Sequence, residues 1–297
     1  MLAKTSAIAL LVAIALTPAA GKLAWRLGIV ARPSPRGVHR VPTPLLGGVA
    51  VVAAWLAALG LGEIGIGRSG PVVAILIGAA AMAGVGLWDD LRSPPWWAKL
   101  VAQVAIAVGF IAVALPELPW PVQAARVAWI VTLTNAFNLI DNSDGLASGN
   151  AAVAAAGYGV LAGPVAPEVA AVALALAGAA SGFFVHNFGR SLIFLGDAGS
   201  LPLGFALGGL GAVLASHDGA PTWPALALPV SYPLFDVAFV IVRRTCAGRS
   251  PVVGGTDHTV HALGAALASL RAAVVLLVAA TAVLTTAAIT VDGAGGD

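Results

Sequence analysis

Long apolar stretches alternate with short polar connections along the whole chain, a pattern typical of membrane-spanning helices. A helix needs about 20 mainly apolar residues to cross the hydrocarbon core of a bilayer. Ten stretches come near that length, at residues 6–29, 46–62, 71–88, 98–115, 121–140, 147–163, 166–186, 199–216, 222–242 and 270–291. They are continuous runs of Ala, Val and Leu without the two-residue alternation of a transmembrane β-barrel. The pattern predicts an all-α, polytopic integral membrane protein with about ten transmembrane helices.

Composition excludes most other classes of protein. Hydrophobic residues make up 59% of the 297 residues and charged residues only 9%, whereas soluble domains carry roughly 25% charged residues. The single cysteine excludes a disulfide framework and disfavours a Cys-based zinc site. The basic residues form no dense patch, so no nucleic-acid partner is expected. The first apolar stretch is long and leads into a basic loop, so we interpret it as a transmembrane helix rather than a signal peptide.

The charges predict how the helices are oriented in the membrane. With ten spans, twelve of the fifteen Lys and Arg residues fall on one face, and only Lys4, Arg68 and Arg126 fall on the other. The positive-inside rule makes the first face cytoplasmic and places both termini outside. Six aspartates share the cytoplasmic face: Asp89, Asp90, Asp141, Asp144, Asp197 and Asp257. Carboxylates near a membrane are costly and usually mark function, so we expect the active site on this face of a single transmembrane domain, residues 1–297.

Two of the polar clusters follow apolar stretches. Asp89 and Asp90 close the third stretch, where the helix dipole disfavours acids, and Lys99 opens the fourth. Adjacent carboxylates repel each other, so one of them can have a raised pKa and serve as a base unless a cation neutralises the pair. A solvated helix end is the alternative interpretation.

A second cluster ends the fifth stretch. Asn135, Asn138 and Asp141 recur every three residues and would share one face of a helix, and Asp144 follows in a turn. Such a polar stripe is costly in a membrane unless it faces a wet cavity or a ligand. An interhelical hydrogen-bonded strip is the alternative.

Two further clusters precede or follow later stretches. Asn187 lies at the end of the seventh, and Phe194 and Asp197 come just before the eighth, whose helix N-terminus favours a bound phosphate. Asp197 alone could equally be an N-cap. His258 and His261 are three residues apart on one helix face and could bind a metal or a phosphate. Arg249 beside them favours an anionic ligand, although arginines at a membrane also serve as topology signals or lipid contacts.

Together these clusters and the loop at residues 32–48 resemble the polyprenyl-phosphate N-acetylhexosamine-1-phosphate transferases. The resemblance covers residues 33–263, and its ordered motifs include NAFNLIDNSDGL and FLGDAGSLPLG. It implies ten spans with a cytoplasmic active site in the cell inner (plasma) membrane. It also implies transfer of a sugar-1-phosphate from a UDP-amino sugar to undecaprenyl or another polyprenyl phosphate, with release of UMP. This would be the first membrane step of cell-envelope polysaccharide assembly.

The resemblance also implies roles for individual residues. Asn138 and Asp197 would bind Mg²⁺, with Mn²⁺ as an alternative ion. Asp89, Asp90, Asp197 and His258 would be catalytic, Asp89 acting near the lipid phosphate as a base or as its positioning group. Substrate binding would fall to residues of all four clusters: Lys99, Asn135, Asp141, Asp144, Asn187, Phe194, Arg249 and His261. Members of the family can dimerise, which leaves a homodimer as one arrangement, although the uniform apolar stretches indicate no interface.

Departures from the family pattern select a branch. Ala31 stands where an Asp is common, Asn142 replaces a frequent Gly, and the final motif lacks adjacent histidines. The last difference favours the N-acetylglucosamine branch over transfer of phospho-N-acetylmuramoyl-pentapeptide. A transporter or lipid flippase would need polar residues at mid-membrane, and the stretches contain few beyond Asp236 and its neighbours. A catalytically dead scaffold is disfavoured because all the expected Asp and Asn residues are present.

Overall fold

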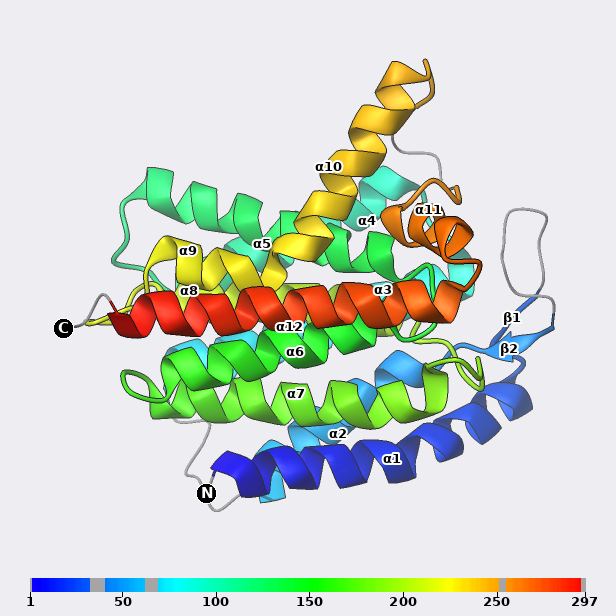
Figure 1. The fold of residues 1–297 in the computed structure, drawn as a ribbon. Coiled ribbons are helices and arrows are strands. Elements are labelled where there is room, and N and C mark those ends of the chain that lie inside the picture. The colour runs from blue at the N-terminus through cyan, green and yellow to red at the C-terminus, as the bar shows by residue number, and fades with distance from the viewer. Residues whose placement is uncertain (1, 33–40, 62–68, 251–254, 295–297) are drawn as a thin grey trace.

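A computed structural model describes residues 2–32, 41–61, 69–250 and 255–294. It shows an all-α protein in which a helix occupies each predicted apolar stretch (Figure 1). The long helices are α1 (Leu2–Leu27), α2 (Gly47–Leu61), α3 (Gly70–Arg92), α4 (Trp96–Ala114), α5 (Trp120–Ile140), α6 (Leu146–Ala162), α7 (Pro167–Asn187), α8 (Asp197–Leu214), α10 (Ser231–Cys246) and α12 (Leu270–Ala294). Short elements are β1 (Val30–Ala31), β2 (Thr43–Pro44), α9 (Trp223–Ala227), the 3₁₀ turn η1 (Leu228–Val230) and α11 (Thr259–Ala266).

The length and composition of these helices make the chain a polytopic membrane protein. Within the described residues, seven segments are long and apolar enough to span a bilayer: α1, α3, α4, α7, α8, α12 and the combined segment Trp223–Cys246. Helices α2 and α6 are apolar but shorter. The count of ten spans therefore remains a prediction. Arg36, Arg40 and Arg68, which contribute to the predicted charge bias, lie outside the described residues.

Helix α8 forms the centre of the bundle. Of its 18 residues, 94% are buried inside the protein. The helix contacts α2, α3, α5 and α6. Gly204 and Gly208 face α5 so closely that a Cβ on Gly204 would lie 2.4 Å from the carbonyl oxygen of Leu133. Small residues four apart are typical of closely packed membrane helices. This spacing packs the middle of α8 closely against α5.

A proline in α1 is compensated by a side chain from α7. Pro18 lies inside α1 and has no N–H, so the carbonyl of Ile14 lacks its usual helical donor. His186 places its Nε2 atom 3.0 Å from that carbonyl oxygen. Gly178 and Gly182 of α7 bring the two backbones together, since a Cβ on Gly182 would lie 2.5 Å from the carbonyl of Leu10. The contact therefore couples α1 to the end of α7 that leads to the candidate site.

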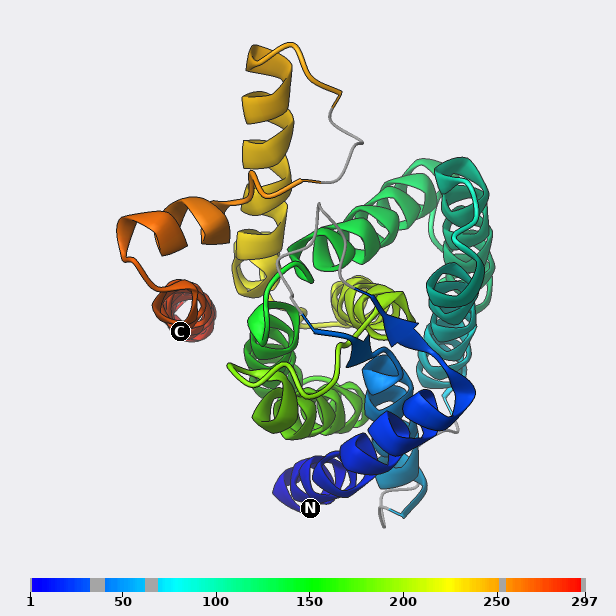
Figure 2. The ribbon, with the colours of Figure 1, turned by 90° about the vertical axis from the view of Figure 1, so that its right-hand side faces the viewer.

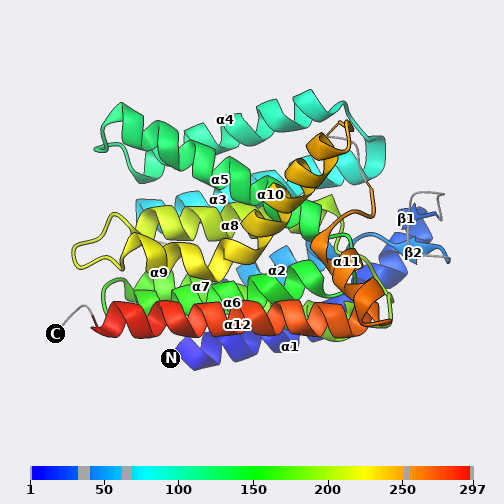
Figure 3. The ribbon, with the colours of Figure 1, turned by 45° about the horizontal axis from the view of Figure 1, so that its top comes forward.

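The ninth predicted stretch, residues 222–242, is a broken helix. Pro229 lies in η1 and Pro233 in the first turn of α10, and both lack the N–H that would continue a regular α-helical ladder. After this break α10 leaves the bundle obliquely, as three views show (Figures 1, 2 and 3). The chain then returns through α11 to α12. The break allows α10 and α11 to stand at the same end of the bundle as the acidic residues.

Alternating helix directions place the predicted chemistry at one end of the bundle. Helices α3, α5 and α7 end where α4, α6 and α8 begin, beside the β1–β2 ribbon (Figures 1 and 2). In that ribbon the strands pair antiparallel, with Val30 opposite Pro44. The described chain ends lie at the opposite end of the bundle (Figure 1). The described chain ends lie at the same end because the chain crosses the length of the bundle an even number of times between them.

Candidate active site

Asp90 of α3 caps the N-terminus of α8. Its Oδ1 accepts a hydrogen bond from the backbone N–H of Asp197 and its Oδ2 one from Ala198, both at 3.0 Å. Gly86, one turn earlier, allows the approach, because a Cβ there would lie 2.1 Å from the carbonyl oxygen of Asp197. An acid is disfavoured at the C-terminus of its own helix but favoured at the N-terminus of another. The position of Asp90 is thus explained by α8 rather than by α3.

Asp197 lies at the centre of the polar cluster. Lys99 Nζ is 2.7 Å from one carboxylate oxygen of Asp197 and 3.4 Å from Asp89. The Asn138 amide donates to the other oxygen of Asp197 at 2.7 Å and to Ser200 Oγ at 3.0 Å. One carboxylate therefore connects side chains from α3, α4, α5 and α8. Charge-assisted bonds of this kind are stronger than neutral ones.

Asp141 adds negative charge beside this cluster. It is the C-cap residue of α5, and its backbone N–H donates to the carbonyl of Asn138 at 3.3 Å. Burial raises the pKa of the Asp141 carboxyl well above its usual range, and repulsion from Asp197, Asp90 and Asp144 raises it further. A cation bound nearby would relieve this repulsion and favour the ionised form.

Asn187 holds together the two loops that frame the cluster. Its Oδ1 accepts from the Gly145 N–H at 2.5 Å, and its Nδ2 donates to the carbonyl of Ile193 at 2.9 Å. Ser191, in the same loop, has a φ of 47° and donates a hydrogen bond to Asp144. A left-handed non-glycine residue is uncommon and persists only where its surroundings hold it. These bonds make the loop after α7 one wall of the site.

The loops and helix ends enclose a cavity of about 550 Å³. That volume lies within the usual range of small-molecule sites. Its lining includes four carboxylates, from Asp90, Asp141, Asp144 and Asp197. Other lining residues come from the loop after α7 and from α11 and α12, among them Asn187, Ser191, Phe194, His261 and Arg271. The cavity is therefore acidic and open to polar ligands.

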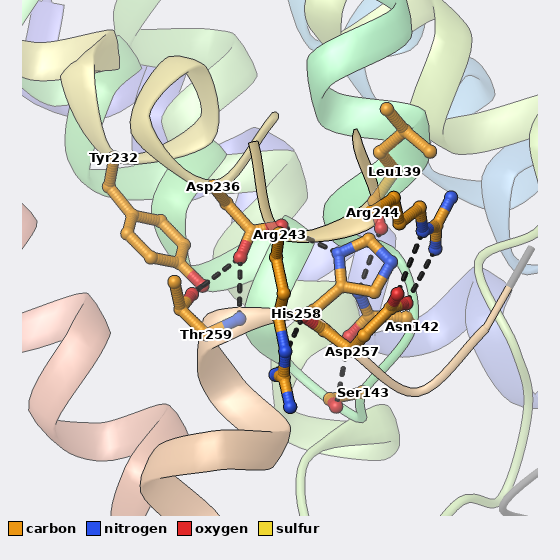
Figure 4. A network of polar contacts seen from close by, with 10 residues as sticks. All are labelled: Leu139, Asn142, Ser143, Tyr232, Asp236, Arg243, Arg244, Asp257, His258 and Thr259. Carbon is orange, nitrogen blue, oxygen red and sulfur yellow. Dashed lines mark hydrogen bonds and ion pairs between the residues drawn. The ribbon is translucent and has the colours of Figure 1, made fainter. Parts of the chain in front are cut away.

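A second network joins α10 to α11 (Figure 4). Asp236 of α10 contacts His258, with 2.6 Å between Oδ2 and Nδ1, and its Oδ1 accepts the backbone N–H of Thr259 at 2.8 Å. Tyr232 Oη lies 3.2 Å from Thr259 Oγ1. Asp236 is 1% exposed, so this buried carboxylate fixes both the imidazole and the start of α11. Asp236 carries no predicted role, although an acid within an apolar stretch signals function.

Asp257 binds two basic residues, Arg244 in the last turn of α10 and Arg249 just after that helix. Arg244 reaches the two carboxylate oxygens of Asp257 at 2.9 and 2.6 Å, and Arg249 Nη2 lies 3.3 Å from the same group. These contacts, led by the hydrogen bonds of Arg244, hold the pKa of Asp257 below its usual range. Arg249 is 58% exposed. Arg249 therefore contacts Asp257 and is absent from the described lining of the cavity.

The two predicted histidines have different surroundings. His258 is 3% exposed, is paired with Asp236 and is absent from the described cavity lining. His261 lines the cavity, and both its ring nitrogens are buried without a hydrogen-bond partner among the described residues. Burial, followed by the proximity of His258, lowers the pKa of His261, which keeps its imidazole neutral at physiological pH. His261 is thus the histidine available to a ligand.

The structure brings most of the predicted site residues together. Asp90, Asp141, Asp144, Asn187, Phe194, Asp197 and His261 line the cavity, and Asp89, Lys99 and Asn138 belong to the hydrogen-bonded and ion-paired cluster around Asp197. Asn135 lies elsewhere, donating from α5 to Gln103 of α4 at 2.7 Å. That contact matches the interhelical alternative for this one member of the stripe. Ser191, Ser200, Asp236 and Arg271 also belong to the two networks or the cavity, and only Asp236 stood out in the sequence.

The carboxylates of the cluster fit a hard divalent cation. Asp89 and Asp197 offer carboxylate oxygens, which Mg²⁺ prefers. Asn138 directs its NH₂ group at Asp197, so its amide oxygen would face an ion there only after the amide turns over. Within the described residues, no three His, Cys, Asp or Glu side chains form a metal-binding group by themselves. Mg²⁺ is usually held by one or two carboxylates together with substrate phosphates. The site therefore fits an ion that binds along with a phosphate-bearing substrate.

The fold and cavity define a multi-pass membrane protein with an acidic site at one end of its helix bundle. Residues 72–215 match the family model described as glycosyl transferase family 4. The chain is 33% identical over 290 residues to decaprenyl-phosphate N-acetylglucosaminephosphotransferase of Mycobacterium tuberculosis (strain ATCC 25618 / H37Rv), covering 81% of this chain and 70% of that protein. The chain belongs to glycosyl transferase family 4, and the predicted family resemblance is confirmed.

Two further relatives represent both branches. A probable undecaprenyl-phosphate N-acetylglucosaminyl 1-phosphate transferase of Bacillus subtilis (strain 168) is 29% identical over 289 residues, or 91% of this chain and 79% of that protein. A phospho-N-acetylmuramoyl-pentapeptide-transferase of Synechococcus sp. (strain JA-3-3Ab) is 34% identical over 229 residues, or 69% of this chain and 66% of that protein. Membership in this family makes the chain an enzyme.

Proposed function

We propose that the enzyme transfers N-acetylglucosamine-1-phosphate from UDP-N-acetylglucosamine to a polyprenyl phosphate. An oxygen of the lipid phosphate attacks the phosphorus next to the sugar, the bond to the bridging oxygen breaks, and UMP leaves with the electron pair. The products are UMP and a lipid-linked diphosphate sugar. The observation that carries this proposal is the Asp197 cluster at the N-terminus of α8, inside an acidic cavity of about 550 Å³.

Within this reaction the chain's own residues position charged groups. Asp197 and Asn138 would hold Mg²⁺, with Mn²⁺ as an alternative, and a bound Mg²⁺ neutralises the phosphate oxygens during transfer. Lys99 forms ion pairs with Asp89 and Asp197. Its ammonium group could exchange these partners for the phosphate of an incoming substrate. Asp89 would then face the lipid phosphate as a base or a positioning group. Asp90 has a positioning role, because both its oxygens already bind the α8 backbone.

The nucleotide sugar would occupy the cavity. Asp141, Asp144 and Phe194 line it and would contact the nucleoside, while Asn187 keeps the two framing loops in place. His261, which stays neutral, can hydrogen-bond the sugar or a phosphate, and His258 supports it from the Asp236 network. Arg249 would stay bound to Asp257, since it is absent from the described lining of the cavity. Asn135 would act through α4, without touching substrate.

A transfer assay tests the proposed reaction. Purified enzyme is incubated with Mg²⁺, undecaprenyl phosphate and either radiolabelled UDP-N-acetylglucosamine or UDP-N-acetylmuramoyl-pentapeptide. We expect labelled lipid and released UMP with the first donor, and loss of both when EDTA removes the metal, because phosphate charge must be neutralised for transfer. Product from the pentapeptide donor alone would assign the enzyme to the other branch. Unchanged turnover in EDTA would contradict the metal requirement.

We further propose that the site end of the bundle faces the cytoplasm and that both termini lie outside the plasma membrane. Ten described basic residues support this orientation by their place at or near the site end: Lys22, Arg26, Arg32, Arg92, Lys99, Arg190, Arg243, Arg244, Arg249 and Arg271. Lys4 and Arg126 lie toward the other end. Twofold association of the chain is a further expectation of the family resemblance, to be tested by the mass of the detergent-solubilised enzyme.

Cysteine labelling tests the orientation. Cys246 is the single cysteine of the chain and is exposed at the end of α10. We expect a membrane-impermeant maleimide to leave it unlabelled in intact cells and to label it in inverted vesicles. The matched control is Glu117→Cys in a Cys246→Ser background, since Glu117 is exposed at the opposite end of the bundle. Labelling of Cys246 in intact cells would reverse the proposed orientation.

A further inference from the structure

The acidic cavity contains one basic side chain of the Lys or Arg type. Among the described residues that line it, Arg271 is the only lysine or arginine, against the carboxylates of Asp90, Asp141, Asp144 and Asp197. An anionic ligand entering this cavity would be repelled by each of these carboxyl groups that is ionised. Mg²⁺ held at Asp197 would offset that repulsion at one place only. Arg271 comes from α12, far in the sequence from the other charged lining residues, and carries no predicted role.

The placement of Arg271 is not explained by its own helix. It is the second residue of α12, and a cation in the first turn of a helix is disfavoured by the helix dipole. Within the described part of the chain it makes no ion pair, and its one hydrogen bond goes from Nη2 to the carbonyl of Gly189. A guanidinium has five N–H donors in a rigid fork. The remaining donors are therefore available beside the cavity.

Gly189 provides the room for this side chain. It has a φ of +67°, and a Cβ at this position would lie 2.9 Å from Arg271 Nε. The guanidinium thus lies directly against the loop after α7. The same loop contributes Ser191 and Phe194 to the cavity, and Ser191 is bonded to Asp144. Arg271 therefore belongs to the wall that the proposed nucleotide sugar would contact.

We propose that Arg271 is a substrate-binding residue that contacts a phosphate group of the nucleotide-sugar donor. This inference rests on the proposed function. The planar guanidinium fork matches two phosphate oxygens, and its charge is retained at all physiological pH values. The donor is favoured over the lipid phosphate because Arg271 shares its wall with Phe194 and Ser191. Lys99, by contrast, is absent from the described lining and pairs with Asp89 and Asp197.

The test compares Arg271→Gln with Arg190→Gln. Glutamine can still donate to the Gly189 carbonyl but has no charge. Arg190 is exposed on the same loop and is absent from the described cavity lining, so its replacement is a matched loss of charge. We expect Arg271→Gln to raise the KM for UDP-N-acetylglucosamine about ten- to a hundredfold, the usual effect of losing a charged hydrogen bond. Arg190→Gln should leave this KM unchanged, and Arg271→Lys should restore part of the loss.

Two further measurements separate substrate binding from a structural role. Competition by uridine, which has no phosphate, should be equal in the wild-type enzyme and in Arg271→Gln. Equal weakening of uridine and UDP-N-acetylglucosamine would show that Arg271 only holds the loop, and would overturn the inference. A rise in the KM for polyprenyl phosphate alone would overturn the assignment to the donor, as would an unchanged donor KM. If the wild-type enzyme makes no labelled lipid, the proposed function itself fails.

Discussion

Replacing Asp197 by Asn should reduce turnover by about three orders of magnitude, since preorganised charges at a transferring phosphoryl group contribute effects of this size. Asp197 is the residue through which Asp89, Lys99 and Asn138 are connected. The amide is nearly isosteric but carries no charge and is a weaker ligand for Mg²⁺. The measurement is the rate of UMP release at saturating concentrations of both substrates and Mg²⁺.

The same variant should insert and fold normally. Asn at position 197 can still accept a hydrogen bond from Lys99, and the cap on α8 uses its backbone N–H, which the substitution leaves unchanged. The matched control is Asp218→Asn, an exposed acid in the turn after the other end of α8. The control should retain wild-type turnover. Normal turnover in Asp197→Asn would refute the central role of this carboxylate.

Replacing Asp89 and replacing Asp90 should have different effects on turnover and on the apparent Tm, although the two residues are adjacent. Asp89→Asn should lower turnover by about two to three orders of magnitude and leave the apparent Tm unchanged, because the partly exposed Asp89 carboxyl contacts Lys99 and Asp197 of the polar cluster and caps no described helix. Asp90→Ala should lower both turnover and the apparent Tm. Its carboxylate caps two N–H groups of α8, and loss of a cap costs about 0.5–2 kcal/mol.

Two assays on the same purified variants check this contrast. Thermal unfolding in detergent gives the apparent Tm, and binding of UDP-N-acetylglucosamine reports whether the cavity is intact. Asp89→Asn should retain donor binding, since Asp89 is absent from the described cavity lining. Loss of donor binding in Asp89→Asn would remove its assignment to the lipid phosphate. An unchanged Tm in Asp90→Ala would show that the α8 N-terminus does not depend on its cap.

Some of the chemistry was predictable because spacing along a helix is local. Asn138 and Asp141 end one apolar stretch, and Asp197 begins another. Once the stretches are recognised as helices that traverse the same bundle, their polar ends must meet at a shared face. This reasoning placed Asp141, Asp144 and Asp197 on one face, and the family resemblance added Asn187 and Phe194. The cavity lining contains all five.

Other features depend on contacts that no local pattern contains. Asp90 and Asp197 are 107 residues apart, and nothing in the sequence around Asp89 and Asp90 tells which of the two faces α8. Asn135 satisfies the same three-residue spacing as Asn138, yet the structure pairs it with Gln103. Arg271 looks like an ordinary topology signal until α12 is placed against the loop after α7.

By itself, the sequence determined that this chain is a helical membrane protein, which ends of its helices carry the polar clusters and which family it resembles. Those properties follow from the length of apolar runs that a bilayer requires and from residue types at fixed short spacing. Only the tertiary structure decided that Asp90 caps α8 while Asp89 pairs with Lys99, that Asp236 holds His258, and that α12 brings Arg271 to the cavity. The physical reason is that a side chain's role is set by the partner it meets, and these partners come from helices distant in the sequence.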